Sequence, residues 1–156
     1  MCDRANLLED TSNPLRDAAN PLCDTANPRC IAHSGLTVYH RESVVYHDPC
    51  YLGRYRNIYD EPRAVIDRFA EQSDPPRARE RSFCCGAGGG QMFLGEEKGK
   101  RINMARAEEL AATGAATVGV ACPFCQSMFR DALPAVSEKP PKLMDIAQIV
   151  AAAIRE

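Results

Sequence analysis

Five of the eight cysteines fall into three groups, and each group follows a segment with the composition of a β-strand. The groups and their preceding strand candidates are Cys50 after residues 43–47, Cys84 and Cys85 after residues 81–83, and Cys122 and Cys125 after residues 116–121. Parallel strands end at one edge of their sheet, where open α/β sheets place their ligand sites. The spacing therefore predicts that thiols far apart in the sequence converge at one edge.

Helical signals alternate with these strands. Apolar residues recur at helical spacing over residues 61–71 and 96–113, Pro123 suits a first helical turn, and residues 143–154 predict a last helix. The alternation predicts an α/β domain with a mostly parallel sheet flanked by helices, and with the cysteines at the carboxyl ends of the strands.

The N-terminal segment differs from the rest of the chain. The dipeptide Asn-Pro recurs every seven residues, beginning at Asn13, Asn20 and Asn27. Asn-Pro initiates turns, and a proline in every heptad excludes a coiled coil. We therefore expect residues 1–34 to be irregular and disordered, with the cysteine-rich domain over residues 35–156. The cysteines of the segment, Cys2, Cys23 and Cys30, are not expected to be ligands.

The five grouped cysteines, Cys50, Cys84, Cys85, Cys122 and Cys125, are the candidate metal ligands. Five thiolates are one too many for a tetrahedral zinc ion, and two adjacent cysteines suit a larger inorganic cluster better than one small ion. Thiolates favour soft sites such as iron–sulfur clusters. Buried apolar cysteines, a redox Cys-x-x-Cys pair and a zinc site that uses four of the five thiolates remain as alternatives.

Glycines follow the paired cysteines directly, at Gly86, Gly88, Gly89 and Gly90. Their spacing is not that of a dinucleotide-binding loop. Without β-carbons, Gly86, Gly88 and Gly89 would let backbone N–H groups approach the sulfurs of a cofactor, which makes them candidate cofactor-binding residues. A flexible surface loop is the alternative.

Other polar residues lie near Cys50. His47 is a candidate for a hydrogen-bonding or proton-transfer role beside the metal, although a strand-end histidine satisfied by the backbone is the simpler interpretation. Arg54 and Arg56 are placed to steer an anionic partner or substrate, whereas the longer basic run that contains them is nearly neutralised by its acids.

Composition excludes several classes of protein. Nineteen basic and twenty-one acidic residues give a formal net charge of −2, without the basic excess of a nucleic-acid-binding protein. The N-terminus lacks the features of a secretory signal. Residues 110–129 carry no charge, but their glycines, proline and polar residues favour a buried strand and helix over a membrane span. We therefore expect a cytoplasmic protein, where patterned cysteines hold metal more often than they form disulfides.

The pattern Cys-x33-Cys-Cys-x36-Cys-x-x-Cys, with His47-Asp48-Pro49-Cys50 and Cys84-Cys85-Gly86, resembles the cysteine-rich CCG domain. That domain occurs in heterodisulfide reductases, in the iron–sulfur subunit of glycolate oxidase and in related oxidoreductases. The sequence around the cysteines most resembles the C-terminal domain of actinobacterial iron–sulfur oxidoreductases that connect electron-transfer flavoprotein to quinone. The resemblance covers residues 43 to about 154.

The resemblance implies an electron-transfer domain with one [4Fe–4S] cluster of the non-cubane type, held by the five cysteines. It would relay electrons between a flavoprotein or thiol donor and a quinone or disulfide acceptor. The ferredoxin motifs, second cysteine-rich domain and membrane anchor of such oxidoreductases are not in this sequence. We therefore expect an oxidoreductase component that needs partner subunits, electron-transfer flavoprotein among the candidates, and that reaches a membrane only through a partner. A zinc-stabilised binding module and a non-functional fragment are the alternatives.

Overall fold

A computed structural model describes residues 30–33, 36–39, 42–94 and 99–153 of the chain. At its centre is a four-stranded sheet in which all neighbouring strands are parallel. The strands are β3 (Ser43–Tyr46), β4 (Glu71–Ser73), β5 (Thr117–Val120) and β6 (Lys142–Asp145), in the spatial order β4-β3-β5-β6. The predicted α/β fold with a parallel sheet is confirmed.

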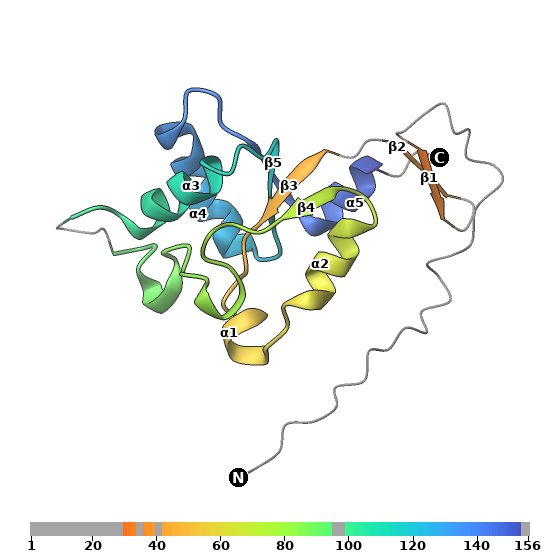
Figure 1. The fold of residues 1–156 in the computed structure, drawn as a ribbon. Coiled ribbons are helices and arrows are strands. Elements are labelled where there is room, and N and C mark those ends of the chain that lie inside the picture. Colours follow the sequence, from red (N-terminus) through yellow and green to blue (C-terminus); the bar gives the residue numbers. More distant parts are fainter. Residues whose placement is uncertain (1–29, 34–35, 40–41, 95–98, 154–156) are drawn as a thin grey trace, which may run out of the picture.

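The described residues contain five α-helices: α1 (Gly53–Arg56), α2 (Asp60–Asp67), α3 (Ile102–Ala111), α4 (Pro123–Val136) and α5 (Ile146–Ala153). Helices α3 and α4 pack together on one face of the sheet, and α2 and α5 pack on the other (Figure 1). The helix predicted to open at Pro123 is confirmed, with Cys122 as its extended N-cap residue.

Successive side chains of β3 enter different cores, because side chains alternate between the two faces of a sheet. Val44 and Tyr46 pack with Ile66 of α2 and Ile149 of α5, whereas Val45 packs with α3 and α4. Both faces of β3 are therefore buried, which explains its continuous apolar sequence.

The order of the strands creates a crevice at the carboxyl edge. From β3 the chain crosses outward to β4 and then returns to the other side of β3 to form β5 and β6. Connections diverge at such a topological switch point and leave a crevice beyond the strand ends. The backbone N–H of His47 donates to the carbonyl oxygen of Gly119 at 2.9 Å, so β3 and β5 stay paired up to this crevice.

Two further strands precede the domain core. Strand β1 (Cys30–His33) and strand β2 (Leu36–Tyr39) form an antiparallel pair. Residues 1–34 were expected to be irregular, but Cys30–His33 form a regular strand. The rest of this predicted Asn-Pro segment lies outside the described residues. The division of the chain at residue 34 stays a prediction.

The strand predicted over residues 81–83 is wrong. Arg79–Arg81 form a 3-10 turn, and Arg79 has a positive φ of 56°. The Arg79 N–H donates to the carboxylate of Asp48 at 2.8 Å, and the Phe83 ring lies under the guanidinium of Arg77 at 3.9 Å. These contacts hold the segment away from the sheet, so Cys84 and Cys85 follow a turn and not a strand.

Three helix boundaries also differ from prediction. Residues 143–145 belong to β6, where Leu143 is in register with Val118, and the last helix begins only at Ile146. Helix α2 ends at Asp67, because Glu71–Ser73 join the sheet beside β3. The helix predicted from residue 96 begins at Ile102, and residues 95–98 lie outside the described part.

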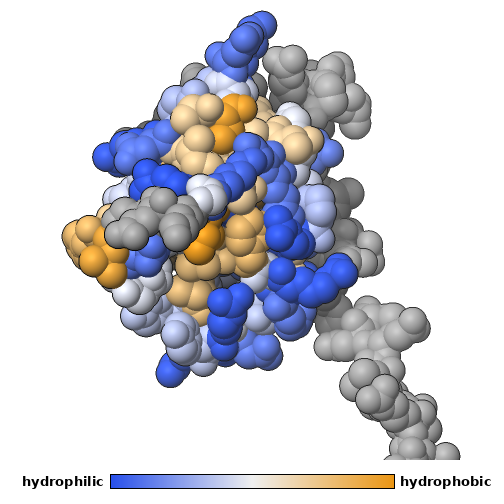
Figure 2. Space-filling view, turned by 90° about the vertical axis from the view of Figure 1, so that its left-hand side faces the viewer, coloured by the Kyte–Doolittle hydropathy of each residue, from blue (hydrophilic) through white to orange (hydrophobic). Residues whose placement is uncertain are grey.

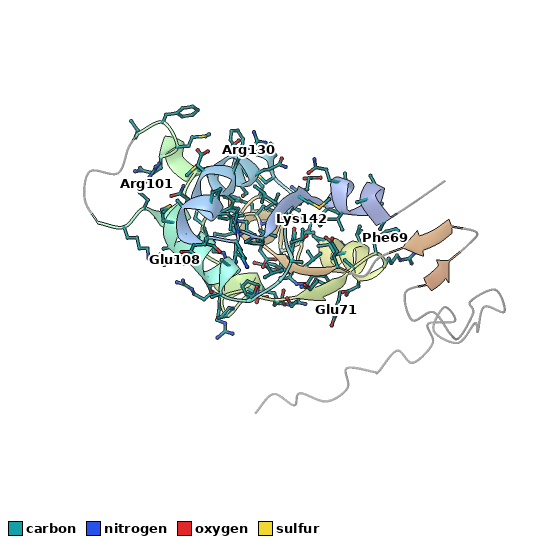
Figure 3. The ribbon with its side chains drawn as sticks, turned by 90° about the horizontal axis from the view of Figure 1, so that it is seen from above. Phe69, Glu71, Arg101, Glu108, Arg130 and Lys142 are labelled. Atoms are coloured by element: carbon teal, nitrogen blue, oxygen red, sulfur yellow. The ribbon has the colours of Figure 1, made fainter. Side chains whose placement is uncertain are left out.

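The domain is elongated across the sheet. Viewed from above, Arg101 and Glu108 of the α3 segment lie at the opposite end from Phe69 and Glu71, which stand at the start of β4 (Figure 3). Within the part of the chain that the structure describes, every helix is too short or too polar to cross a membrane.

Candidate metal centre

A pocket opens at the carboxyl edge of β3, where three chain segments meet. Its cavity volume is about 20 Å³. Four of the predicted ligands line it: Cys50, Cys84, Cys85 and Cys125. The fifth, Cys122, lies outside this lining at the start of α4 and packs partly buried against the core. The polar part of the wall includes His47 and Asp48, at the end of β3, Arg54 of α1, and Arg79 and Ser82.

Two of the thiols are buried deep in this pocket. Cys85 and Cys125 are 4% and 2% exposed, and their sulfurs lie with a ring nitrogen of His47 within 4.8 Å of one another. Cys50, Cys84 and Cys122 are half-buried, and all five cysteines are free thiols. The pocket therefore brings soft donor atoms together from the ends of separate chain segments.

Hydrogen bonds to neighbouring thiols raise the pKa values of Cys84 and Cys85, which keeps these two thiols protonated in the metal-free protein. The hydrogen bond to Cys85, together with burial, raises the pKa of Cys84 to about 12. The pKa of Cys85 is raised to about 12, mainly by its hydrogen bond to Cys125. The hydrogen bond with Cys84 acts in the opposite direction and lowers this pKa. Metal ions bind thiolates, so a soft metal would release these protons on binding.

The glycine segment supplies backbone donors to the same sulfurs. The N–H of Gly86 donates to the Cys84 sulfur at 3.3 Å, and the backbone of Gly88 also lowers the pKa of that thiol. A β-carbon on Gly88 would lie 3.6 Å from the same sulfur. Gly89 has a φ of +64° and no atom within 4 Å of an added β-carbon. Gly86 and Gly88 thus lie against the thiols, whereas Gly89 shapes the turn.

Sequence reasoning missed Arg106, whose buried guanidinium contacts His47. Its Nε donates to His47 Nδ1 at 3.2 Å, and its Nη1 donates to Glu109 Oε2 at 3.0 Å. Arg106 is fully buried, and His47 is 1% exposed. Burial, and then the charge of Arg106, lower the pKa of His47 well below its ordinary value, so the imidazole is neutral. The two residues are 59 positions apart in sequence. The local sequence of α3 therefore does not predict that the Arg106 side chain is buried.

A second polar cluster lies beside the thiols and was also missed. Arg63 of α2 donates to both carboxylate oxygens of Asp48, at 2.7 and 2.9 Å, and to Asp74 Oδ1 at 2.7 Å. It also donates to the carbonyl oxygen of Tyr59, and Arg79 donates its N–H to Asp48. Burial opposes the charge, but the two carboxylates outweigh it and raise the pKa of Arg63 above its ordinary value. We call these residues the Arg63 network.

One buried hydroxyl group lacks a partner. Tyr46 is fully buried at the end of β3, and its Oη is the one buried side-chain polar atom without a hydrogen bond among the described residues. Burial, then the charge of Asp48, raise the pKa of this phenol above its ordinary range, with Cys125 adding to the effect. A buried unsatisfied donor is costly, and native structures usually keep one only where a water, ion or ligand completes it.

The donor set fits a soft metal centre. Four thiols line one pocket, and backbone N–H groups approach the Cys84 sulfur. Thiolate ligands and N–H donors to sulfur are the environment of protein-bound iron–sulfur clusters, and thiolates also bind zinc. The residues present therefore fit either metal class.

Fold and pocket together define a cysteine-rich α/β domain. The model of the cysteine-rich domain family CCG matches residues 44–130, more than half of the chain, and the chain belongs to this family. The resemblance drawn from the cysteine spacing is confirmed.

Several known proteins contain a similar segment. The chain is 38% identical over 110 residues to the probable iron-sulfur-binding oxidoreductase FadF of Bacillus subtilis, which is 69% of this chain and 16% of that protein. It is 38% identical over 112 residues to the EtfAB:quinone oxidoreductase of Syntrophomonas wolfei, covering 66% of this chain and 16% of that protein. It is 31% identical over 112 residues to a subunit of the dihydromethanophenazine:CoB–CoM heterodisulfide reductase of Methanosarcina barkeri, covering 69% of this chain and 26% of that protein.

This chain therefore spans about a sixth of the length of the first two relatives. No solved structure matches it.

Proposed function

We propose that this chain is an iron–sulfur electron-transfer domain of an oxidoreductase. The observation that carries the proposal is the pocket at the switch point, where thiols from the end of β3, the glycine segment and the start of α4 meet. The names of the relatives support it, because FadF is described as an iron-sulfur-binding oxidoreductase. We propose Cys50, Cys84, Cys85, Cys122 and Cys125 as ligands of one [4Fe–4S] cluster of the non-cubane type.

Each part of the pocket has a role in this proposal. An iron–sulfur cluster supplies reversible one-electron chemistry when bound. The thiolates would hold the metal, and the N–H groups of Gly86 and Gly88 would stabilise negative charge on the Cys84 sulfur. Burial of Cys85 and Cys125 excludes water from the deeper side of the site. The half-buried Cys50 and Cys84 leave the outer side accessible for electron transfer.

The experiment is anaerobic purification with iron, sulfide and zinc quantified in the same sample. We expect iron and sulfide in equal amounts, and Cys84→Ser or Cys122→Ser should abolish iron binding because each removes a thiolate. Cys23→Ser and Cys30→Ser are the matched controls, since both lie outside the CCG match, and should leave iron intact.

The alternative, a zinc-stabilised module, has a distinct outcome. It predicts one zinc ion, no sulfide and no reduction by dithionite. Cys122 lies outside the pocket lining, so the zinc alternative also predicts that Cys122→Ser retains the metal. Iron loss in the Cys122 variant would exclude that four-ligand arrangement.

We propose that electrons enter from a flavoprotein or thiol donor and leave to a quinone or disulfide through partner subunits. Support comes from large exposed apolar side chains in the segments that follow Cys50, Cys85 and Cys122: Tyr51, Tyr55, Phe93, Leu94 and Phe124, between 52% and 81% exposed. Figure 2 shows apolar patches among hydrophilic side chains on the face that carries α3. Exposed apolar patches mark protein contact sites.

The free thiols in the described part of the chain support a reducing, cytoplasmic location.

The holo domain should be reduced by dithionite yet stay inactive towards disulfides or quinone analogues until a partner is added. Steady turnover by the isolated domain with a flavoprotein donor would contradict the need for partner subunits.

A further inference from the structure

We propose that His47 is a hydrogen-bond donor to a sulfur of the metal centre, not a ligand, and that Arg106 is the positioning residue that determines this choice. The inference rests on the proposed function, because it assigns a role to residues around the same pocket. It concerns which atom of His47 faces the metal centre and what holds it there.

Proximity alone would make His47 a ligand. One of its ring nitrogens lies within 4.8 Å of the Cys85 and Cys125 sulfurs, and all three residues are buried. Sites that combine imidazole nitrogen with thiolate sulfur are common for zinc, and they also occur in iron–sulfur proteins. The distinction depends on where the imidazole proton sits.

The hydrogen bond from Arg106 fixes that proton. A guanidinium has only donors and keeps its charge in proteins, so an atom that it contacts must be an acceptor. Arg106 Nε donates to His47 Nδ1 at 3.2 Å, which requires an unprotonated Nδ1. A neutral imidazole then carries its one proton on Nε2. An Nε2–H group has no lone pair for a metal, but it is a good donor to sulfur.

Nε2 is also the atom left available. The hydrogen bonds of the described residues give the His47 side chain a single partner, Arg106, and His47 lines the same pocket as the thiols. The imidazole packs against the Phe129 ring in an edge-to-face arrangement, with centroids 4.8 Å apart, which restricts the plane of the imidazole. His47 thus offers one N–H to the pocket that Cys50, Cys84, Cys85 and Cys125 line.

Arg106 is itself held from several directions. Its Nη1 donates to the Arg77 carbonyl oxygen at 2.9 Å and to Glu109 Oε2 at 3.0 Å, and its Nη2 donates to Ser82 Oγ at 3.5 Å. The guanidinium carbon also lies 5.2 Å from the centre of the Phe83 ring. A fully buried arginine with these partners cannot swing away from His47, so the direction of the imidazole is fixed before any metal binds.

The consequence is a higher reduction potential. Reduction adds negative charge to the metal centre, and an N–H that points at a sulfur stabilises that charge. Removal of the donor should therefore lower the potential without removing a ligand.

The first test needs no metal. We would measure the ¹⁵N and ¹³C NMR shifts of histidine-labelled, metal-free protein and assign His47 among the three histidines by comparison with His47→Gln. We expect His47 as the neutral Nε2–H form, and Arg106→Met should mix in the Nδ1–H form because the donor to Nδ1 is lost. A wild-type Nδ1–H form or an imidazolium would overturn the inference.

The second test uses the metal-loaded protein and its reduction potential. His47→Leu should keep its iron and have a lower potential, whereas His47→Gln, which keeps an N–H donor, should lie nearer the wild-type value. Thr117→Val is the matched control, since it removes a buried polar group at the far end of the neighbouring strand β5 and should leave the potential unchanged.

The outcomes separate this inference from the proposed function. If the wild-type protein holds no iron or sulfide, the proposed function fails, and the tautomer measurement still decides the role of Arg106. If the wild type holds a cluster and both His47 variants lose it, His47 is a ligand and the inference is wrong. An unchanged potential in His47→Leu would also overturn it.

Discussion

The carboxyl edge of the sheet carries two polar clusters that differ in how they are completed. In the Arg63 network, every charge meets an opposite charge or a backbone group within the fold. In the thiol pocket, the hydrogen bonds of Cys84 and Cys85 run mainly to other thiols and to backbone N–H groups of the glycine segment. Asp48 joins them, because it belongs to the network and also lines the pocket.

The difference separates a structural scaffold from a candidate binding site. Buried charges are stable only when paired, so the Arg63 network fixes the connection between β3, α2 and the loop after β4 without any ligand. Thiols with raised pKa values stay neutral and can share a pocket without repulsion, yet they leave soft donor atoms unused. Residues of the Arg63 network, Asp48, Tyr59 and Arg79, therefore form one wall of the pocket.

The largest expected effect is the loss of the network. Arg63→Met leaves the Asp48 carboxylate buried without its partner and should lower the free energy of unfolding by about 3–5 kcal/mol, with or without metal. Urea denaturation measures the change. Lys100→Met is the control, because it breaks the exposed ion pair with Glu108 and should cost about 0–1 kcal/mol. An equal loss in the free energy of unfolding for Arg63→Met and Lys100→Met would show that the Arg63 network is not a structural scaffold.

Removal of the metal should have the next largest effect. A site loaded at one hundred times its dissociation constant stabilises the folded state by about 2.7 kcal/mol, so metal-free protein should unfold at clearly lower urea. The comparison needs anaerobic unfolding of the metal-loaded and metal-free forms. Equal midpoints would show that the pocket contributes nothing to folding, and that the network alone is sufficient.

A smaller effect is expected on the pH dependence of stability, through Glu109, which pairs with Arg106. Burial raises the pKa of Glu109, but Arg77 and Arg106 outweigh it and lower this pKa below its ordinary value of 4.5. A carboxyl group with a lowered folded-state pKa stabilises the protein above its unfolded-state pKa, and this contribution is lost as the pH falls through the folded-state value. Glu109→Gln should therefore flatten the decline in stability below pH 4.5, and it should cost about 1 kcal/mol at neutral pH.

The measurement is the free energy of unfolding as a function of pH for wild type and Glu109→Gln. A variant with the same acid decline as wild type would show that Glu109 is not a charge partner of Arg106, and that the polar core around His47 is completed by other groups.

Local sequence was enough to predict the class of fold. Val44, Val45 and Thr117 to Val120 are β-branched or small and lie where strands were predicted, because a strand buried on both faces needs that composition. The cysteine spacing predicted the family, and four of the five thiols lie in one pocket. The full set of five ligands stays a prediction.

Short or ambiguous segments were not predictable. Glu71–Ser73 form β4 although Glu, Gln and Ser do not alternate apolar and polar residues, so their pairing with β3 is decided by the rest of the sheet. Leu143 and Met144 fit a helix or a strand equally well by periodicity, and the free place beside β5 makes them a strand. Residues 81–83 have strand composition, but the hydrogen bond from Arg79 to Asp48 and the contact of Phe83 with Arg77 hold this segment away from the sheet.

The sequence by itself therefore determined the parallel α/β fold and the family, because those depend on composition and spacing along the chain. Only the tertiary structure decided the surroundings of the thiols. Arg106 meets His47 across 59 positions, and Arg63 meets Asp48 across 15, and neither pair follows a local period. Such contacts exist only once α2 and α3 pack on opposite faces of the sheet, since burial selects the partner of each charge after the chain has folded.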